Sequence, residues 1–273
     1  MITSVKVSGL GAATRNAEFP FRQDAPVDSS YYVDSVDGLG PTKADLNMSA
    51  YPTQNRNKFN SSRVGGHQVV LNLGYDPDLS AGETVETLRR NLYTIVPPEA
   101  NVRLTFVDSI LGETYIEGHI ESAEPDIFSK EPRFVVTFVS EDSYFSKYIP
   151  APTVATNTYV AMPYTGTAPT QLLNISLTVP SAANVFNLWI NNAKMLEFAY
   201  NLKANDFVQL SLGRGYRQAV VNQSASMLDA ITLGDLQQEF NAATDSIWIG
   251  LLNGTTPVGA AVQLDFVTNY VGF

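Results

Sequence analysis

A long succession of short strand-like segments, separated by turn residues, most limits what this chain folds into. Residues 2–8 alternate apolar and polar side chains, and residues 67–75 form a denser apolar run. Both patterns are typical of β-strands that are half-buried or buried. Similar segments recur almost to the end of the sequence, at 101–108, 113–122, 133–140, 171–179, 184–190, 194–200, 206–212, 216–222, 246–252 and 261–267. The sequence therefore predicts a mainly β protein.

One segment has the period of a helix. Residues 82–96 place apolar side chains three or four positions apart, at Val85, Leu88, Leu92 and Ile95. Glu83 and Glu86 suit the positive end of a helix dipole, and Pro97 ends the pattern. The expected fold class is mainly β with a minor α component.

The distribution of these segments predicts two domains. Residues 1–148 combine strands with the single helix, and residues 171–273 contain about seven short strands, the pattern of a β-sandwich. Residues 149–170 carry four prolines and read as a linker. Asn191–Asn192 is the expected hairpin turn inside the second domain. Residues 41–66, rich in Asn and Ser, read as a long arm loop of the kind that is functional or ordered by a partner.

Composition excludes several classes of function. The chain has 17 basic and 27 acidic residues, a net charge of −10, and no run of Lys or Arg, which disfavours nucleic-acid binding. It has no cysteine, which removes disulfides and thiolate chemistry. No secretion signal or apolar run of about 20 residues is visible, so we expect a soluble product made in the cytoplasm.

The densest group of chemically active side chains is His119, Glu121, Glu124 and Asp126. On a strand, residues 119 and 121 point to one face, as a metal site requires. A transition-metal site normally draws on more than one histidine, however, and the only other is His67, 52 positions away (119 − 67). Glu124 precedes a proline, which indicates a solvated turn. We therefore expect a strand, an acidic turn and a second strand, and no metal site.

Other catalytic patterns are weak or missing. Gly9-x-Gly11 follows a strand but lacks the third glycine and the helix of a dinucleotide site. No G-x-S-x-G elbow, P-loop or H-E-x-x-H occurs. The second half offers acidic side chains that could be paired in a glycosidase, Asp206, Asp229, Asp235 and Asp265, but any acidic protein does so. We expect neither an enzyme nor a cofactor.

Trp189 and Trp248 leave two interpretations open. Both lie in apolar strand segments, NLWI and IWIG, where a tryptophan is usually a core residue. The alternative is that they form an aromatic platform for a sugar.

Several ordered motifs resemble one family. YYVDSVDGLGP (31–41), SSRVGGHQVVLNLGYDPD (61–78), TVETLRRNLYTIVPP (84–98) and YIEGHIESAEPDIFSKEPRFVVTFVSEDSYF (115–145) are similar to the N-terminal domain of siphophage distal tail proteins. The final SIWIGLLNGTTPVGAAVQLDFV resembles that family's last strands in outline, although residues 253–257 replace its compact Pro-Gly-x-Asn turn.

The resemblance implies an N-terminal ring-forming (belt) domain, typically hexameric, followed by a C-terminal galectin-like β-sandwich. Such a ring lies at the distal tip of a non-contractile tail, leaves a channel for DNA, and joins the tail tube protein to the tip hub. The sandwich docks receptor-binding or side-fibre proteins. It implies a structural virion protein without catalysis; the alternatives are a carbohydrate-binding adhesin module of the tail tip and a tail-associated hydrolase.

The resemblance also suggests assembly residues. These are Arg63 and His67, and around the acidic turn Glu124, Asp126, Phe128 and Ser129. A ring subunit leaves edges and arms that only its neighbours satisfy, so we expect residues 41–66 to order on a neighbouring subunit. Six copies carry 6 × −10 = −60 formal charges, and a bore lined by part of this charge would repel DNA.

Overall fold

The computed structural model covers residues 1–273 and divides into two compact units. Unit 1 comprises Met1–Ser146 and Val271–Phe273, and unit 2 comprises Lys147–Tyr270. The structure describes all residues except 11–15, 27–28, 51–56, 78–80, 127–131, 150–152, 162–165, 213–217, 235–238 and 241–245. The side chains of residues 50, 57, 58, 62, 169–171, 239 and 240 also lie outside the description.

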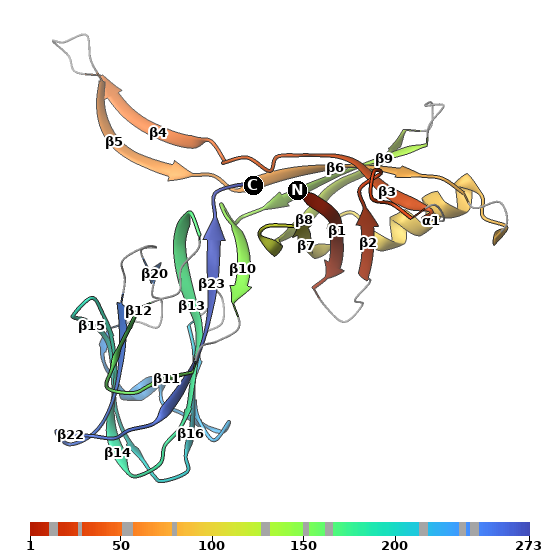
Figure 1. Ribbon diagram of the computed structural model, residues 1–273. Helices are drawn as coiled ribbons and strands as arrows, with labels where there is room; N and C mark the ends of the chain where they lie inside the picture. Colours follow the sequence, from red (N-terminus) through yellow and green to blue (C-terminus); the bar gives the residue numbers. More distant parts are fainter. Residues whose placement is uncertain are drawn as a thin grey trace. The chain divides into compact units, whose positions relative to one another are not determined.

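Unit 1 is built mainly from antiparallel strands (Figure 1). They are β1 (Ile2–Gly9), β2 (Asn16–Pro20), β3 (Tyr31–Asp37), β4 (Ala44–Ala50), β5 (Asn57–Val64), β6 (His67–Tyr75), β7 (Asn101–Asp108), β8 (Gly112–Asp126), β9 (Arg133–Ser140) and the beginning of β10 (Phe145–Ile149). Seven of them pair in the order β2-β1-β7-β8-β9-β6-β3.

The two ends of this strand order meet. Phe21, just after β2, forms a parallel bridge with Val33 of β3, and the backbone N–H of Arg22 donates to the Val33 carbonyl at 3.0 Å. The order therefore closes on itself. Strand β8 makes the closure possible because its 15 residues pair with β7 in the first half and with β9 in the second.

Alternation fixes which side chains fill unit 1. Val5 and Val7 of β1, like Leu71 and Leu73 of β6, are two positions apart and fully buried. Since successive side chains on a strand point to opposite faces, each pair faces one interior. The interior also holds several fully buried aromatic side chains, Phe19, Phe106, Phe134, Phe138 and Phe145.

The single α-helix among the described residues is α1 (Val85–Ile95). The Thr84 side chain caps its first turn by accepting a hydrogen bond from the Thr87 N–H at 3.2 Å. Leu88 and Leu92, one turn apart, are buried, and the Tyr31 hydroxyl donates to the Leu88 carbonyl at 3.1 Å. The helix predicted from the 3.6-residue period is therefore present.

Unit 2 is a two-layer β-sandwich. Its strands are β11 (Thr153–Ala155), β12 (Tyr159–Ala161), β13 (Ala168–Thr178), β14 (Ala183–Ile190), β15 (Ala193–Leu202), β16 (Phe207–Ser211), β17 (Gln218–Val221), β18 (Ala225–Ser226), β19 (Ile231–Gly234), β20 (Glu239–Phe240), β21 (Ser246–Asn253), β22 (Thr256–Pro257) and β23 (Ala261–Tyr270), with a 3₁₀ turn at Leu228–Ala230. One layer has the order β18-β17-β16-β13-β23, with β11 also on β23, and the other has the order β12-β21-β14-β15-β19.

Buried apolar side chains from both layers form one cluster in unit 2. Leu172, Ile175 and Leu177 come from the first layer, and Leu188 and Ile249 come from the second. The β14–β15 hairpin turns at Asn191 and Asn192, whose φ angles of 48° and 67° are those of the predicted tight turn. With one α-helix and antiparallel sheets in the described part of the chain, the mainly β fold class is confirmed.

Two details differ from the sequence interpretation. The described residues of the supposed linker 149–170 contain β11 and β12, which pair with β23 and β21. Thr156 secures the segment between them, because its hydroxyl donates to the Val258 carbonyl at 2.9 Å. The last three residues of the chain belong to unit 1. None of the helices among the described residues is both long and apolar enough to cross a membrane.

Candidate assembly and binding surfaces

The first candidate surface is the arm, which we define as β4 and β5. The two strands pair only with each other, and Figure 1 shows them as a ribbon extending from the other strands of unit 1. The expectation of a loop over residues 41–66 was therefore wrong for residues 44–50 and 57–64. The Asn- and Ser-rich composition hid the strands, although Leu46 and Met48 already alternate with polar residues.

One face of the arm is apolar. Leu46 and Met48 are two residues apart on β4, Met48 lies opposite Phe59, and Ala44 lies opposite Val64. The larger side chains remain open to solvent, with Leu46 54%, Met48 49%, Phe59 56% and Val64 39% exposed. Single exposed apolar residues are ordinary, but several together on one face mark a contact site.

The opposite face of the arm is polar. Asp45 lies opposite Arg63, and Asn47 follows two positions after Asp45. A bulge beyond Asn47 brings Ser49 and Asn60 together, and the Asn60 amide donates to the Ser49 hydroxyl at 3.1 Å. Since an isolated two-stranded hairpin is marginally stable in water, the exposed apolar face of this amphipathic arm is a candidate contact surface.

The root of the arm is held by His67, the first residue of β6, which follows the arm after Gly65 and Gly66. Its side chain is 1% exposed, its Nε2 lies 3.0 Å from the Gly40 carbonyl oxygen, and its ring meets the Phe145 ring edge-on at 4.7 Å. Because Gly40 precedes β4, this contact joins the two ends of the arm. His67, which we expected at a subunit contact, is thus buried within its own chain, whereas Arg63 is exposed on the arm.

Residues at the end of the chain reinforce the same root. The Phe273 N–H donates to the Leu39 carbonyl at 3.0 Å. The Phe273 ring packs edge-on against Phe106 at 5.5 Å and Phe145 at 4.9 Å. These contacts anchor the base of the arm to the interior of unit 1.

The acidic stretch that follows Gly118 is strand, and not the predicted turn, as far as Asp126; residues 127–131 of that turn lie outside the described residues. Strand β8 continues through Pro125 to Asp126, with Glu124 opposite Val135 and Asp126 opposite Arg133. This half of β8 pairs with β9 on one side and has no partner strand on the side where β7 pairs with the first half. A proline, which has no N–H to donate, is tolerated in a strand that has one such unpaired edge. Glu124 and Asp126 are exposed, while Phe128 and Ser129 lie outside the described residues.

The metal interpretation of the same stretch finds no support. His119 and Glu121 are exposed, and the Gln68 side-chain amide donates to Glu121 at 3.4 Å. Among the residues that the structure describes, no group of three or more His, Asp or Glu side chains is arranged to hold a metal ion.

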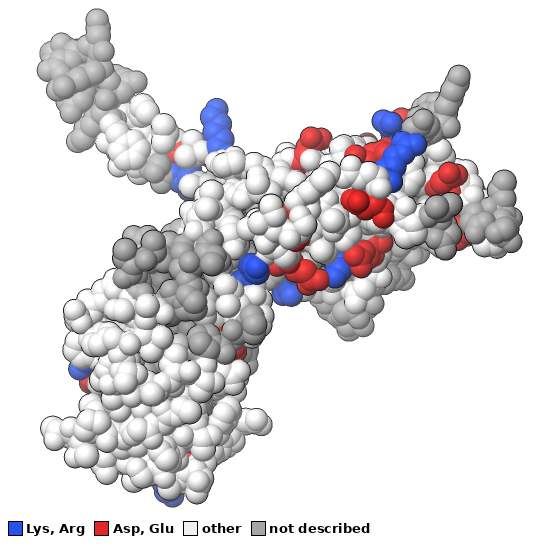
Figure 2. All heavy atoms as spheres, viewed as in Figure 1, with Lys and Arg blue, Asp and Glu red and all other residues white. Residues whose placement is uncertain are grey.

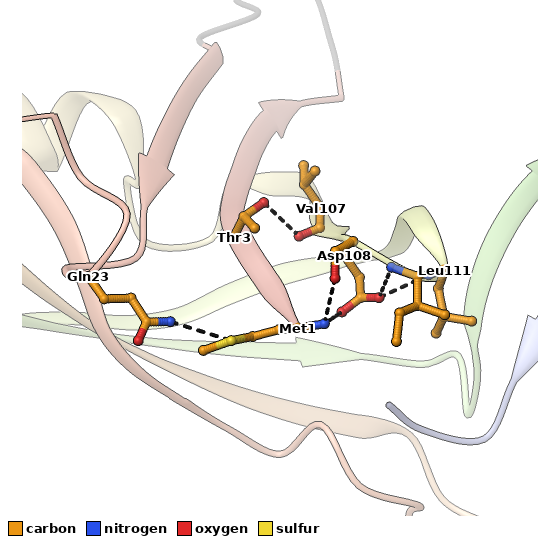
Figure 3. Close-up of polar contacts among 8 residues, drawn as sticks. Met1, Thr3, Gln23, Val107, Asp108 and Leu111 are labelled. Carbon is orange, nitrogen blue, oxygen red and sulfur yellow. Dashed lines mark hydrogen bonds and ion pairs between the residues drawn. The ribbon is translucent and has the colours of Figure 1, made fainter.

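Polar contacts of Asp108 hold the β7–β8 turn (Figure 3). Asp108 accepts hydrogen bonds from the Ile110 N–H at 2.7 Å and the Leu111 N–H at 2.9 Å, and its other oxygen lies 2.7 Å from the Met1 ammonium. The ammonium and these two N–H groups lower the pKa of Asp108 to about 2. Ile110 is 84% exposed at the tip of this turn.

Unit 2 carries an aromatic face on the β12-β21-β14-β15 layer. Tyr159 lies opposite Trp248, Trp248 opposite Trp189, and Trp189 opposite Lys194. The Trp189 and Trp248 rings meet at right angles with centroids 6.0 Å apart, and Lys194 Nζ lies 5.3 Å from the Trp189 centroid. Their neighbours in sequence, Leu188 and Ile249, fill the core. Both tryptophans are therefore on the outer face and partly exposed.

Charge separates the two units. Only 12 of the 44 charged residues (17 + 27) fall within Lys147–Tyr270, five basic and seven acidic. Figure 2 shows the same contrast on the face it draws, with red and blue side chains gathered over unit 1 and few over unit 2. Unit 2 is therefore poor in charged residues.

Two searches with the sequence of this chain find no match. A scan against models of known protein families finds no match. A search of curated proteins finds none either.

Three solved structures of phage proteins are similar to this chain over nearly its whole length. The chain resembles the Dit protein of SPP1, described as a paradigm of the hub adsorption apparatus in phages that infect Gram-positive bacteria. The match has a TM-score of 0.67 and 12% identity and covers 96% of this chain and 98% of that one. It also resembles chains of the phage P2 baseplate in its activated conformation, with calcium (TM-score 0.55, 10% identity) and with strontium (TM-score 0.54, 9% identity). Each of these covers 97% of this chain and 98% of the other. The chain has the Dit-like fold over nearly its whole length.

Proposed function

We propose that this protein is a structural component of the distal tip of a long, non-contractile phage tail. Unit 1 assembles into a ring, probed below as a hexamer, which joins the tail tube protein to the tip hub and leaves a channel for DNA. Unit 2, a galectin-like sandwich, faces the adhesion device and docks receptor-binding or side-fibre proteins. The protein acts without catalysis, and its place is the virion.

The observation that carries this proposal is the apolar face of the arm. Leu46, Met48 and Phe59 are about half exposed on a ribbon that no other described strand covers. A protein that worked alone would gain nothing from holding such a face in solvent on a fixed base. In a ring, each arm covers its apolar face on the neighbouring subunit, and every subunit makes this same contact with the next one.

The fold match supports the same role. Three solved structures that this chain resembles over nearly its whole length are a Dit protein, described as a paradigm of a hub adsorption apparatus, and chains of a phage baseplate. Glu124, Asp126 and the exposed Ile110 mark further edges of unit 1 for contacts within the ring or with the tube.

The acidic composition suits a conduit for DNA. Unit 1 contains 20 acidic and 12 basic residues, so a bore formed by it repels phosphates provided the excess acids face inward. A ring whose channel is lined mostly by Lys and Arg would overturn this part of the proposal.

Two measurements test the proposed function. Mass photometry of the purified protein should detect a species of about 179 kDa (6 × 29.8 kDa) that negative-stain images show as a ring with a central hole. Mass spectrometry of purified virions, with antibody labelling seen by electron microscopy, should place the chain at the tail end farthest from the capsid. Absence of the chain from virions would refute the proposal.

A further inference from the structure

The aromatic face of unit 2 combines stacking surface with hydrogen-bonding groups that the chain itself leaves unused. Asn187 and Trp189 are two residues apart on β14, so their side chains share the outer face. Asn187 is 4% exposed and its Oδ1 is buried without a hydrogen-bond partner, and so is Trp189 Nε1. Buried polar atoms are nearly always paired, so one unpaired acceptor and one unpaired donor on the same face require an explanation.

On one side of the strand, Asn187 is covered by the side chain of Trp248 and not by that of its partner residue. Asn187 lies opposite Gly250 of β21, which has no side chain. The Trp248 ring fills the position instead, since a Cβ added to Gly250 would lie 2.2 Å from that ring. The indole thus lies over the backbone beside Asn187, held by no hydrogen bond, and turning it away would expose the amide.

The remaining side of the face is fixed by an ion pair. Glu197 lies opposite Asn187 on β15, and Lys194 Nζ is 2.6 Å from its Oε2. The Thr232 hydroxyl donates to Glu197 Oε1 at 2.8 Å. Lys194 and Thr232 together lower the pKa of the Glu197 carboxyl, so the pair is charged at neutral pH and neutral overall. The face therefore offers no net charge to attract an ion.

We propose that this face binds a neutral saccharide. The Trp248 and Tyr159 rings supply the apolar surface for the C–H face of a sugar ring, and Tyr159 is 52% exposed. Asn187 Oδ1 accepts a hydrogen bond from a hydroxyl, and Trp189 Nε1 donates one. A sugar is the ligand class that matches an aromatic surface flanked by single donors and acceptors on a charge-poor unit. A protein partner would need a larger apolar area and no unpaired amide.

The test uses the full chain and five neutral tetrasaccharide probes: maltotetraose, cellotetraose, mannotetraose, galactotetraose and N,N′,N″,N‴-tetraacetylchitotetraose. Titrations are followed by tryptophan fluorescence and by saturation-transfer difference NMR. Because the Trp248 indole must move, we expect at least one probe to change the fluorescence saturably and to show saturation transfer at its ring protons. Absence of both signals for all five probes at 10 mM would overturn the proposal.

Variants assign any binding to this face. Trp248→Ala and Tyr159→Ala should each weaken binding of the positive probe at least tenfold, and Tyr159→Phe should keep it. Tyr148→Ala removes an aromatic side chain, 49% exposed, elsewhere in unit 2 and should change nothing. Tyr159→Ala keeps the test valid should Trp248→Ala fail to fold. Undiminished binding by folded Tyr159→Ala would overturn the proposal. The ring mass is an independent readout, since the arm and this face lie in different units.

Discussion

The arm allows the assembly hypothesis to be tested by one set of substitutions. Replacing Leu46, Met48 and Phe59 together by serine removes most of the large side chains from the apolar face of the arm. The strands should persist, since serine adopts extended backbone and none of the three side chains is buried in the subunit. The substitution therefore acts on the interface and leaves unit 1 folded.

The expected magnitude follows from the exposed fractions. Fully burying a Leu, Met or Phe side chain is worth about 1.5–3 kcal/mol. The three side chains are 54%, 49% and 56% exposed, so covering the remainder yields about 1 kcal/mol each, or about 3 kcal/mol per interface. At about 1.4 kcal/mol per tenfold change, the variant should need a roughly hundredfold higher concentration to assemble.

A dilution series followed by mass photometry measures this shift as the concentration at which half of the chains are in rings. The control replaces Leu228 and Leu233 by serine, because they are 41% and 46% exposed but lie in unit 2. Far-UV circular dichroism and the melting temperature confirm that each variant is folded. If the arm variant assembles at the same concentration as the parent, or if the control is weakened equally, the apolar face does not form the interface.

Three further substitutions test the stability of unit 1. Gly118→Ala places a Cβ 2.3 Å from the Val139 carbonyl oxygen and should lower the unit 1 melting temperature by roughly 3–10 °C, at about 1–3 kcal/mol of overpacking, whereas Gly65→Ala, with nothing within 4 Å, should not. Thr84→Ala removes the α1 cap and should cost about 1 kcal/mol in a urea titration. Asp108→Asn loses the contact with the Met1 ammonium. Because the folded pKa of about 2 is below the ordinary value of about 3.9, this stabilisation is present above pH 4 and fades as pH falls to 2. The free energies of unfolding of the Asp108→Asn variant and parent, from urea titrations, should therefore differ by about 1–2 kcal/mol at pH 6 and converge near pH 2, and a constant difference would contradict the assignment.

Local patterns predicted the elements that depend on local physics. The helix followed from the spacing of Leu88 and Leu92, and the β14–β15 turn followed from Asn191–Asn192, because Asn tolerates positive φ. The prediction of a linker at residues 149–170 missed strands β11 and β12, because their pairing depends on residues distant in the sequence. Prolines and threonines mark a chain that leaves regular structure, but they do not reveal that Tyr159 finds a pairing partner in Trp248, 89 positions later (248 − 159).

Surface residues were predicted less well than the fold. His67 was expected at a contact but is buried at the root of the arm, because its partners Gly40 and Phe145 are distant in sequence. The tryptophans were weighed as core residues, since NLWI and IWIG are apolar throughout. Only the pairing of strands shows that Trp189 and Trp248 share the outer face, and that Asn187 beside them is left unpaired.

The apolar face of the arm and the aromatic face of unit 2 differ in their buried polar atoms, and this difference suits them to different kinds of partner. On the described arm, polar side chains such as Asn47 and Ser49 occupy the solvated face, and the apolar face has no buried donor or acceptor left unpaired. Covering it requires only a complementary apolar surface, which another folded subunit provides at the cost of little desolvation. On unit 2, Asn187 and Trp189 bring a buried acceptor and donor to the aromatic face. An apolar protein surface would leave both unpaired at about 1–3 kcal/mol each, whereas a ligand dense in hydroxyls satisfies them. The two proposals, assembly through the arm and sugar binding by unit 2, therefore rest on the same rule of hydrogen-bond satisfaction.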